Sequence, residues 1–155
     1  MNVMPMKSKV LLNAGGMASL LAALLHLAVI AGGPDWYRFF GAGEEMAKMA
    51  EQNSWYPALL TLMISSLLVA AAMYAFSGAG LIARLPWQRP VLCVITGVYL
   101  FRAVYGVLFL LIAGHFPLLQ QVTERPVFML VSSLICLAVG LSYFLGVRSH
   151  WHRLS

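Results

Sequence analysis

The chain has 155 residues, of which 61% are hydrophobic and only 10% are charged. So few charged side chains cannot cover a water-facing surface, and the composition therefore excludes a soluble globular domain and predicts a membrane-embedded one. The formal net charge of +5 would point to nucleic acid in a soluble protein, but here the charges flank apolar runs, so we expect no nucleic-acid partner.

Four apolar runs are each long enough to cross a bilayer, which takes about 20 helical residues. They cover residues 10–31, 55–83, 91–113 and 127–147. We therefore predict an all-α membrane protein, a four-transmembrane-helix bundle that forms a single integral membrane domain over residues 1–155. The first run has a cleaved signal peptide as its alternative interpretation, but its length and the presence of His26 disfavour this.

The charges outside the runs fall into two groups that alternate along the chain. Six cations lie on one side of the predicted bundle: Lys7, Lys9, Arg84, Arg89, Arg148 and Arg153. The other side receives Arg38, Lys48 and Arg125 together with all the carboxylates, which are Asp35, Glu44, Glu45, Glu51 and Glu124. The positive-inside rule then predicts cytoplasmic N- and C-termini and an outer loop over residues 32–54. The short tails and the lack of a targeting extension lead us to expect the cell inner membrane.

The outer loop of residues 32–54 is longer than a bundle needs to join two helices, and its aromatic residues argue against disorder. After a short aromatic turn and a glycine-rich break, residues 44–52 place Met46 on one side and Glu44 and Lys48 on the other. We predict a short amphipathic helical segment at the outer mouth of the bundle, with Glu44 and Lys48 paired at i,i+4.

Small residues at helical spacing predict where the spans touch, because they let two backbones approach closely. They are Gly15, Ser19, Ala22 and Ala23 in the first run, Ser66, Ala70 and Ser77 in the second, and Ser133, Cys136 and Gly140 in the fourth. In the third run, Tyr99, Arg102 and Tyr105 share one face with Gly106 and Phe109 at 100° per residue. We expect that face to point into protein or a cavity.

Arg102 lies midway along the third run, where a charge costs a few kcal/mol or more unless it is paired or hydrated. The candidate partners are Glu44 and Glu45, with Asp35 second. Arg102 is then a structural ion-pair anchor, a ligand or substrate contact, or an oligomer contact. His26 is either a hydrogen-bonded core residue or a proton carrier or ligand. The predicted polar site in the outer half of the bundle comprises Arg102, His26, Glu44, Glu45, Tyr99 and Tyr105.

The chain carries none of the common hydrolase or phosphate-loop motifs, and no family is assigned. We expect neither a metal nor a cofactor. The preferred hypothesis is a non-catalytic membrane protein that binds a lipid-like or anionic ligand at the polar site, or that acts as a subunit or accessory factor in a homo-oligomer or with a membrane-protein partner. The alternative is a small membrane enzyme acting on a lipid or isoprenoid-like substrate, in which Glu44 or Glu45 and His26 move protons and Arg102 stabilises negative charge.

Overall fold

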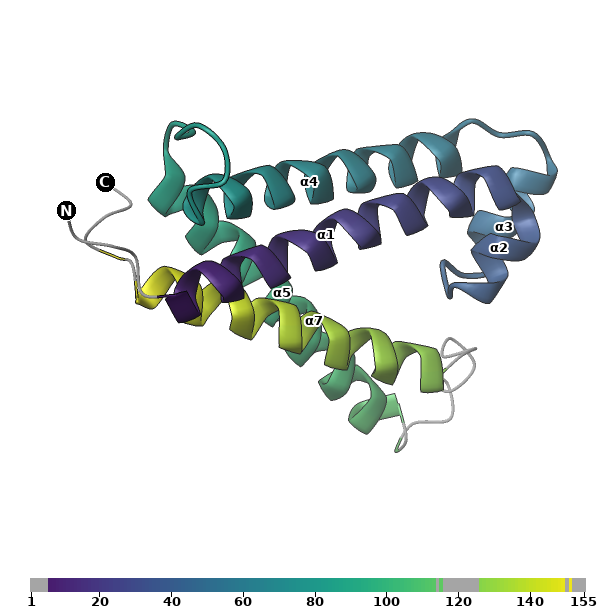
Figure 1. The fold of residues 1–155 in the computed structure, drawn as a ribbon. Coiled ribbons are helices and arrows are strands. Elements are labelled where there is room, and N and C mark those ends of the chain that lie inside the picture. Colours follow the sequence, from purple (N-terminus) through teal and green to yellow (C-terminus); the bar gives the residue numbers. More distant parts are fainter. Residues whose placement is uncertain (1–5, 114, 116–125, 150, 152–155) are drawn as a thin grey trace.

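The structure, a computed structural model, describes residues 6–113, 115, 126–149 and 151. Helices form the regular structure of these residues, and no strand occurs in them, so the predicted all-α class is confirmed. The helices are α1 (Met6–Gly32), α2 (Pro34–Phe39), α3 (Glu44–Glu51), α4 (Tyr56–Gly78), α5 (Gln88–Ala113) and α7 (Pro126–Arg148) (Figure 1).

Within the described residues, α1, α4, α5 and α7 are the four helices long and apolar enough to cross a membrane. Many of their large apolar side chains face outward, for example Leu21, Phe101 and Leu134. A water-soluble bundle would bury such residues, whereas the hydrocarbon of a bilayer accepts them. The exposed surface of the long helices therefore suits a multi-pass membrane protein.

The four long helices form two antiparallel pairs. Helix α1 packs along α4, and α5 packs along α7. Helix α1 also contacts α7 and so joins the two pairs, whereas the contact between α4 and α5 is small. Figure 1 shows the pairs crossing one another, with α2 and α3 beside the end of α1 that leads into them. The N-terminal helix is therefore the shared element of the bundle.

The main core lies where the pairs cross, and every long helix contributes to it. Leu12 of α1, Ala75 of α4, Leu92 of α5 and Tyr143 of α7 are fully buried in this cluster. Close approach is needed here, because a Cβ atom on Gly146 would lie 2.7 Å from the Leu12 side chain. The small residue thus sets the distance between α1 and α7.

The predicted small-residue contacts are confirmed in α1 but shifted in α4. In α1 the buried members are Gly15, Ser19 and Ala23. In α4 the expected Ser77 is buried, but Ser66 and Ala70 are exposed. Ser65 is buried in place of Ser66, with its hydroxyl donating to the Ala23 carbonyl at 3.0 Å. Two adjacent serines in an apolar helix give no sequence signal for which one faces the neighbour, and tertiary contact decides.

Helix α4 ends at Gly78, before the predicted limit of Ala83. Gly80 has a φ of 77°, the left-handed conformation that commonly closes a helix. The Ser77 hydroxyl then holds the following turn, because it donates to the Ala83 carbonyl at 2.9 Å and accepts the Leu85 N–H at 2.9 Å. The predicted span was too long at this end because the residues after Gly78 are also apolar.

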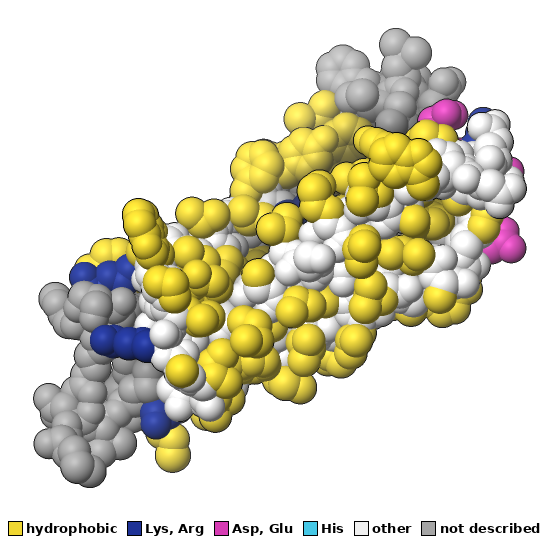
Figure 2. Space-filling view, turned by 90° about the horizontal axis from the view of Figure 1, so that it is seen from above, with side chains coloured by type: hydrophobic (Ala, Val, Ile, Leu, Met, Phe, Trp, Pro, Cys, Tyr) yellow, Lys and Arg dark blue, Asp and Glu magenta, His cyan; other side chains and the backbone are white. Residues whose placement is uncertain are grey.

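The charged residues outside the long-helix interiors lie at opposite ends of the bundle. We call the two ends the basic end and the acidic end. The basic end holds Lys7, Lys9, Arg84, Arg89 and Arg148, near the start of α1, the α4–α5 turn and the end of α7. The acidic end holds α2 and α3 with Asp35, Glu44, Glu45 and Glu51. Figure 2 shows acidic side chains at one end of the molecule and most of the visible basic side chains at the other, with hydrophobic side chains between them.

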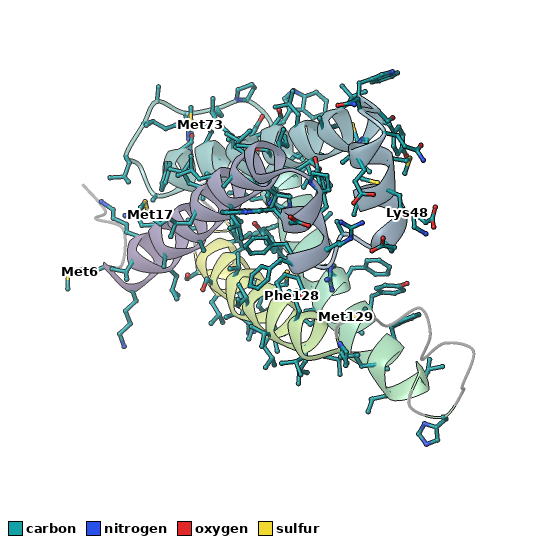
Figure 3. All side chains as sticks on the ribbon, turned by 90° about the vertical axis from the view of Figure 1, so that its right-hand side faces the viewer. Met6, Met17, Lys48, Met73, Phe128 and Met129 are labelled. Carbon is teal, nitrogen blue, oxygen red and sulfur yellow. The ribbon has the colours of Figure 1, made fainter. Side chains whose placement is uncertain are left out.

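Helix α3 is the predicted amphipathic segment, and its apolar side packs on the protein. Ala47 is fully buried against Tyr37 of α2 and Val29 of α1, and Met46 packs on the same cluster. Lys48 lies on the opposite, exposed side (Figure 3). The amphipathic pattern therefore attaches the α2–α3 segment to the end of α1.

The α2–α3 segment also reaches the second helix pair. The Phe40 ring meets the Phe128 ring of α7 edge-on, with 6.0 Å between their centroids. A Cβ atom on Gly41 would lie 3.0 Å from the same Phe128 ring, which Figure 3 places at the start of α7. The segment thus contacts both helix pairs at the acidic end.

Candidate functional site

Arg102 is held by hydroxyl groups in the middle of α5. Its Nη1 donates to Ser133 Oγ at 3.2 Å, and its Nη2 donates to Ser132 Oγ at 3.3 Å. The side chain is half-buried, and both acceptors belong to α7. Within the described residues Arg102 forms no ion pair with a carboxylate.

The two serines are oriented by their own helix. Both hydroxyls donate to the Met129 carbonyl, Ser132 at 3.0 Å and Ser133 at 2.7 Å. Each serine has a single hydroxyl proton, so its oxygen lone pairs are left to accept from Arg102. The arrangement meets the geometry of a guanidinium, but it supplies no opposite charge from the residues that the structure describes.

Gly106, one turn after Arg102, provides the space for this contact. A Cβ atom at Gly106 would overlap Ser133 Oγ and would lie 2.6 Å from Arg102 Nη1. The guanidinium therefore lies over Gly106, displaced along α5 toward the acidic end. This is the direction in which a buried arginine extends to reach the nearer membrane interface.

The predicted partner of Arg102 is engaged elsewhere. Both oxygens of Glu44 accept from Arg38, at 2.9 Å from Nε and 2.9 Å from Nη2. Arg38 also pairs with Glu51 at 2.7 Å and with Asp35 at 3.5 Å. The expected pair between Arg102 and Glu44 is thus replaced by a carboxylate cluster around Arg38, within the α2–α3 segment.

Hydrogen bonding in this cluster changes two pKa values. The bond from Arg38 holds the pKa of Glu44 below its ordinary value. The bonds to Glu44 and Glu51 raise the pKa of Arg38 further above neutrality. Glu45 is not part of this cluster, since its side chain is 85% exposed. It lies 3.5 Å from Lys48, so a Glu45–Lys48 pair replaces the predicted Glu44–Lys48 pair.

His26 is bonded within its own helix. Its Nδ1 lies 2.7 Å from the Ala22 carbonyl, and a carbonyl can only accept, so Nδ1 carries a proton. The ring is half-buried. The core-histidine interpretation accounts for this contact, and the described hydrogen bonds do not join His26 to Arg102.

Tyr99 belongs to a separate hydroxyl network. Its hydroxyl lies 2.8 Å from Ser19 Oγ, and Ser19 Oγ lies 3.0 Å from the Tyr143 hydroxyl. Tyr143 in turn donates to the Ala71 carbonyl at 3.1 Å, so the network links all four long helices. Tyr143 was not predicted, although it continues the helical row of Ser133, Cys136 and Gly140 by one step.

Tyr105 is not on the inner face that the helical wheel assigned to it. Half of its surface is exposed, and its ring stacks between Phe101 and Phe109 on the outside of α5. Tyr105 lies three residues after Arg102, so steps of about 100° add up to about 300° and leave the two side chains about 60° apart around α5. The structure therefore brings Arg102, Ser132, Ser133 and Gly106 together, and it separates them from Tyr105 and Glu44.

Comparison with known proteins adds no relative. No protein-family model, no curated protein and no solved structure matches the chain.

Proposed function

We propose that this protein is a multi-pass inner-membrane protein that binds the anionic group of a lipid-like ligand at Arg102. One observation carries the proposal: the guanidinium in the middle of α5 donates to two neutral hydroxyls, and no described carboxylate pairs with it. Serine hydroxyls satisfy donors without compensating charge. An unneutralised cation in a low-dielectric setting attracts an anion more strongly than it would in water.

The donor count supports the same assignment. A guanidinium has five N–H donors, and Arg102 directs two of its nitrogens to serines of α7. The remaining N–H groups can donate hydrogen bonds to a phosphate or carboxylate, and such charge-assisted hydrogen bonds are about twice as strong as neutral ones. A half-buried position on the α5–α7 pair gives an amphipathic ligand access from the bilayer.

The enzyme hypothesis receives no comparable support. Proton transfer needs at least two ionisable groups that converge on one cavity. Glu44 is held by Arg38, and His26 bonds to its own helix, so neither joins Arg102 in the described contacts. Binding is therefore the preferred function.

The orientation in the membrane is part of the proposal. The basic end is assigned to the cytoplasm by the positive-inside rule, and both the start of α1 and the end of α7 lie there. The acidic end, with α2 and α3, then faces outward. A ligand at Arg102 would sit in the outer half of the bundle.

The proposal is tested by the lipids that copurify with the protein. Wild type, Arg102→Gln and the control Arg84→Gln, which removes an exposed arginine of the basic end, are extracted from the same membranes and analysed by mass spectrometry. We expect an anionic amphiphile that is retained in wild type and control but depleted about tenfold in Arg102→Gln, the loss equivalent to about 1.4 kcal/mol.

Equal content of that amphiphile in wild type and Arg102→Gln would overturn the proposal. A double variant, Ser132→Ala with Ser133→Ala, separates ligand binding from packing. It removes the neutral acceptors but keeps the charge, so we expect it to lower thermal stability while retaining the anionic amphiphile. Loss of stability in Arg102→Gln without any change in bound amphiphile would identify Arg102 as a structural anchor instead.

A further inference from the structure

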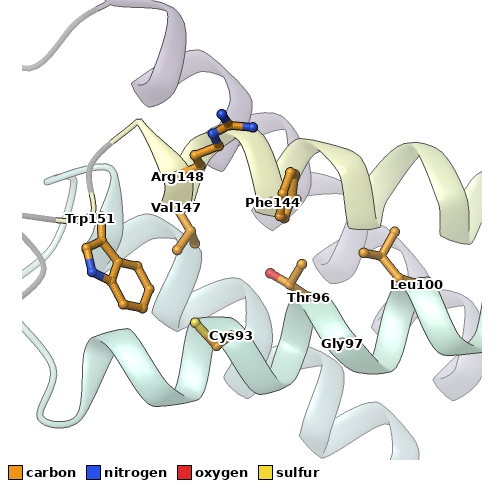
Figure 4. A pocket seen from close by; sticks show the side chains of 8 residues that line it. All are labelled: Cys93, Thr96, Gly97, Leu100, Phe144, Val147, Arg148 and Trp151. Carbon is orange, nitrogen blue, oxygen red and sulfur yellow. The ribbon is translucent and has the colours of Figure 1, made fainter.

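A cavity lies at the basic end, away from Arg102, between α5 and α7. Its volume is about 420 Å³, within the range of roughly 300–1,000 Å³ of small-molecule sites. Cys93, Gly97 and Leu100 of α5 line it from one side, and Phe144 and Val147 of α7 line it from the other (Figure 4). Its walls are therefore mainly apolar.

The floor of this cavity is open because of one glycine. A Cβ atom on Gly97 would meet no atom within 4 Å. Arg89 and Leu100 lie 11 positions apart along α5, which is about 16 Å at a rise of about 1.5 Å per residue, and the α5 residues that line the cavity run from Cys93 to Leu100. One leaflet of the hydrocarbon core is about 15 Å deep, half of about 30 Å. The distance from Arg89 to the far end of the groove at Leu100 therefore matches the depth of one leaflet.

The mouth of the cavity is cationic. Trp151 lines it, and the Arg89 guanidinium lies 5.6 Å from the centre of the Trp151 ring. Arg89 Nε is buried and has no hydrogen-bond partner. Arg148 also lines the cavity, although in Figure 4 its guanidinium points away from Cys93. The described carboxylates all lie at the acidic end, so none is available here to neutralise these cations.

From this juxtaposition we propose that the α5–α7 groove is a binding site for an anionic phospholipid of the surrounding bilayer. The phosphate sits by Arg89 at the level of Trp151, and one acyl chain runs along Gly97 between α5 and α7. Tryptophan prefers the headgroup level of a membrane, and an arginine above its ring supplies the charge that distinguishes anionic from zwitterionic lipid. The site is independent of the ligand assigned to Arg102.

Retention of a defined lipid tests this site. The full chain is reconstituted in vesicles of phosphatidylcholine and phosphatidylglycerol in equal amounts, extracted in detergent and examined by native mass spectrometry. We expect wild type to retain phosphatidylglycerol in preference to phosphatidylcholine. Arg89→Gln should lower that preference about tenfold, whereas Lys7→Gln, which removes a cation of the same end outside the groove, should leave it unchanged.

A steric variant keeps the test decisive if loss of Arg89 impairs folding. Gly97→Leu fills the groove and, because it points into open space, should keep the thermal stability of wild type while losing retained lipid. Val94→Leu, on an exposed position of α5 outside the groove, is its matched control. The proposal would be overturned if wild type retained both lipids equally, or if Arg89→Gln and Lys7→Gln had equal effects. It would also be overturned if the groove proved to join two copies of the chain, so that wild type formed a lipid-free dimer that Gly97→Leu dissociates. Unchanged retention in Arg102→Gln would keep this site distinct from the proposed function.

Discussion

Arg38 and Arg102 have different kinds of partner, and the cost of removing charges from water explains the difference. Arg38 is surrounded by carboxylates at the exposed acidic end, whereas the described partners of Arg102 in the middle of α5 are hydroxyls. Moving Glu44 beside Arg102 would bury a second ion, at an effective cost of several kcal/mol. Arg38 lies only six positions from Glu44, so pairing them closes a short loop in a setting closer to water.

The contact at Gly106 is expected to be intolerant of a single methyl group. Gly106→Ala should push Arg102 and Ser133 apart and should destabilise the fold by about 1–3 kcal/mol, as overpacked cores do. Gly97→Ala on the same helix has no neighbour to displace, so it should be neutral or stabilise by about 0.5–1 kcal/mol. Thermal unfolding of the two variants in one detergent gives the comparison. Equal unfolding temperatures would show that the guanidinium does not lie over Gly106.

The position of a residue along its helix, which can be read from the sequence, predicts part of the site. The side of the helix on which the residue lies could not be predicted. Ser132 and Ser133 lie about 10 Å from the start of α7 and Arg102 about 16 Å from the end of α5, at about 1.5 Å per residue. The Arg102 side chain extends about one helical turn along α5, which brings its guanidinium to the level of the two serines. Comparing positions along the helices would therefore have identified the serines as acceptors. Tyr105 was misplaced because a helix that is apolar all round gives no stripe to show which side faces its neighbour.

At the scale of elements, the sequence predicted the α2–α3 segment well. The glycine-rich break and the amphipathic pattern over residues 44–52 match α3, whose apolar side packs on Tyr37 and Val29. Its charge pairing could not be predicted from the helix alone. The i,i+4 rule pairs Glu44 with Lys48. In the structure Arg38, in the last turn of α2, donates to both carboxylate oxygens of Glu44 at once.

The stability of the α2–α3 segment should fall at acid pH. Because Arg38 holds the folded-state pKa of Glu44 below its unfolded value, the pair stabilises the segment above the ordinary carboxyl pKa of about 4.3. That contribution is lost as the pH drops through the lower, folded-state pKa. Amide protection factors in α3, corrected for intrinsic exchange, should decrease severalfold across this window in wild type.

Two glutamine variants separate the pair from general acid effects. Glu44→Gln should show weak protection of α3 at neutral pH and little further change on acidification. Glu45→Gln removes a neighbouring carboxylate that does not contact Arg38, and it should follow wild type. If both variants behave alike, the cluster around Arg38 does not stabilise the segment.

For the molecule as a whole, the number of long helices was predictable but their pairing was not. Each of the four is apolar enough to cross a membrane, and this depends only on local composition. Which helices pack together depends on small residues whose facing is ambiguous, as Ser65 and Ser66 illustrate. The pairing of α1 with α4 and of α5 with α7 emerges only from three-dimensional contact.

The orientation of the whole molecule is tested by reporter fusions. Alkaline phosphatase joined after α7 should be inactive, and green fluorescent protein joined there should fluoresce, because the basic end is expected in the cytoplasm. Alkaline phosphatase inserted at Gly41-Ala42-Gly43 should be active. The reverse pattern at the two positions would place the acidic end inside.

The serine and threonine bonds within single helices have a consequence for biosynthesis. Ser19, Thr96 and Ser133 each donate to a carbonyl four positions earlier, at 2.9, 2.7 and 2.7 Å. Ser19 and Tyr99 are 80 positions apart, so at a synthesis rate of about 5–20 residues per second Ser19 waits on the order of ten seconds for Tyr99. During that interval a nascent α1 can enter lipid with its hydroxyl proton already bonded. The same oxygen keeps its lone pairs to accept from the Tyr99 hydroxyl, so α5 can dock on α1 without first breaking the bond within α1.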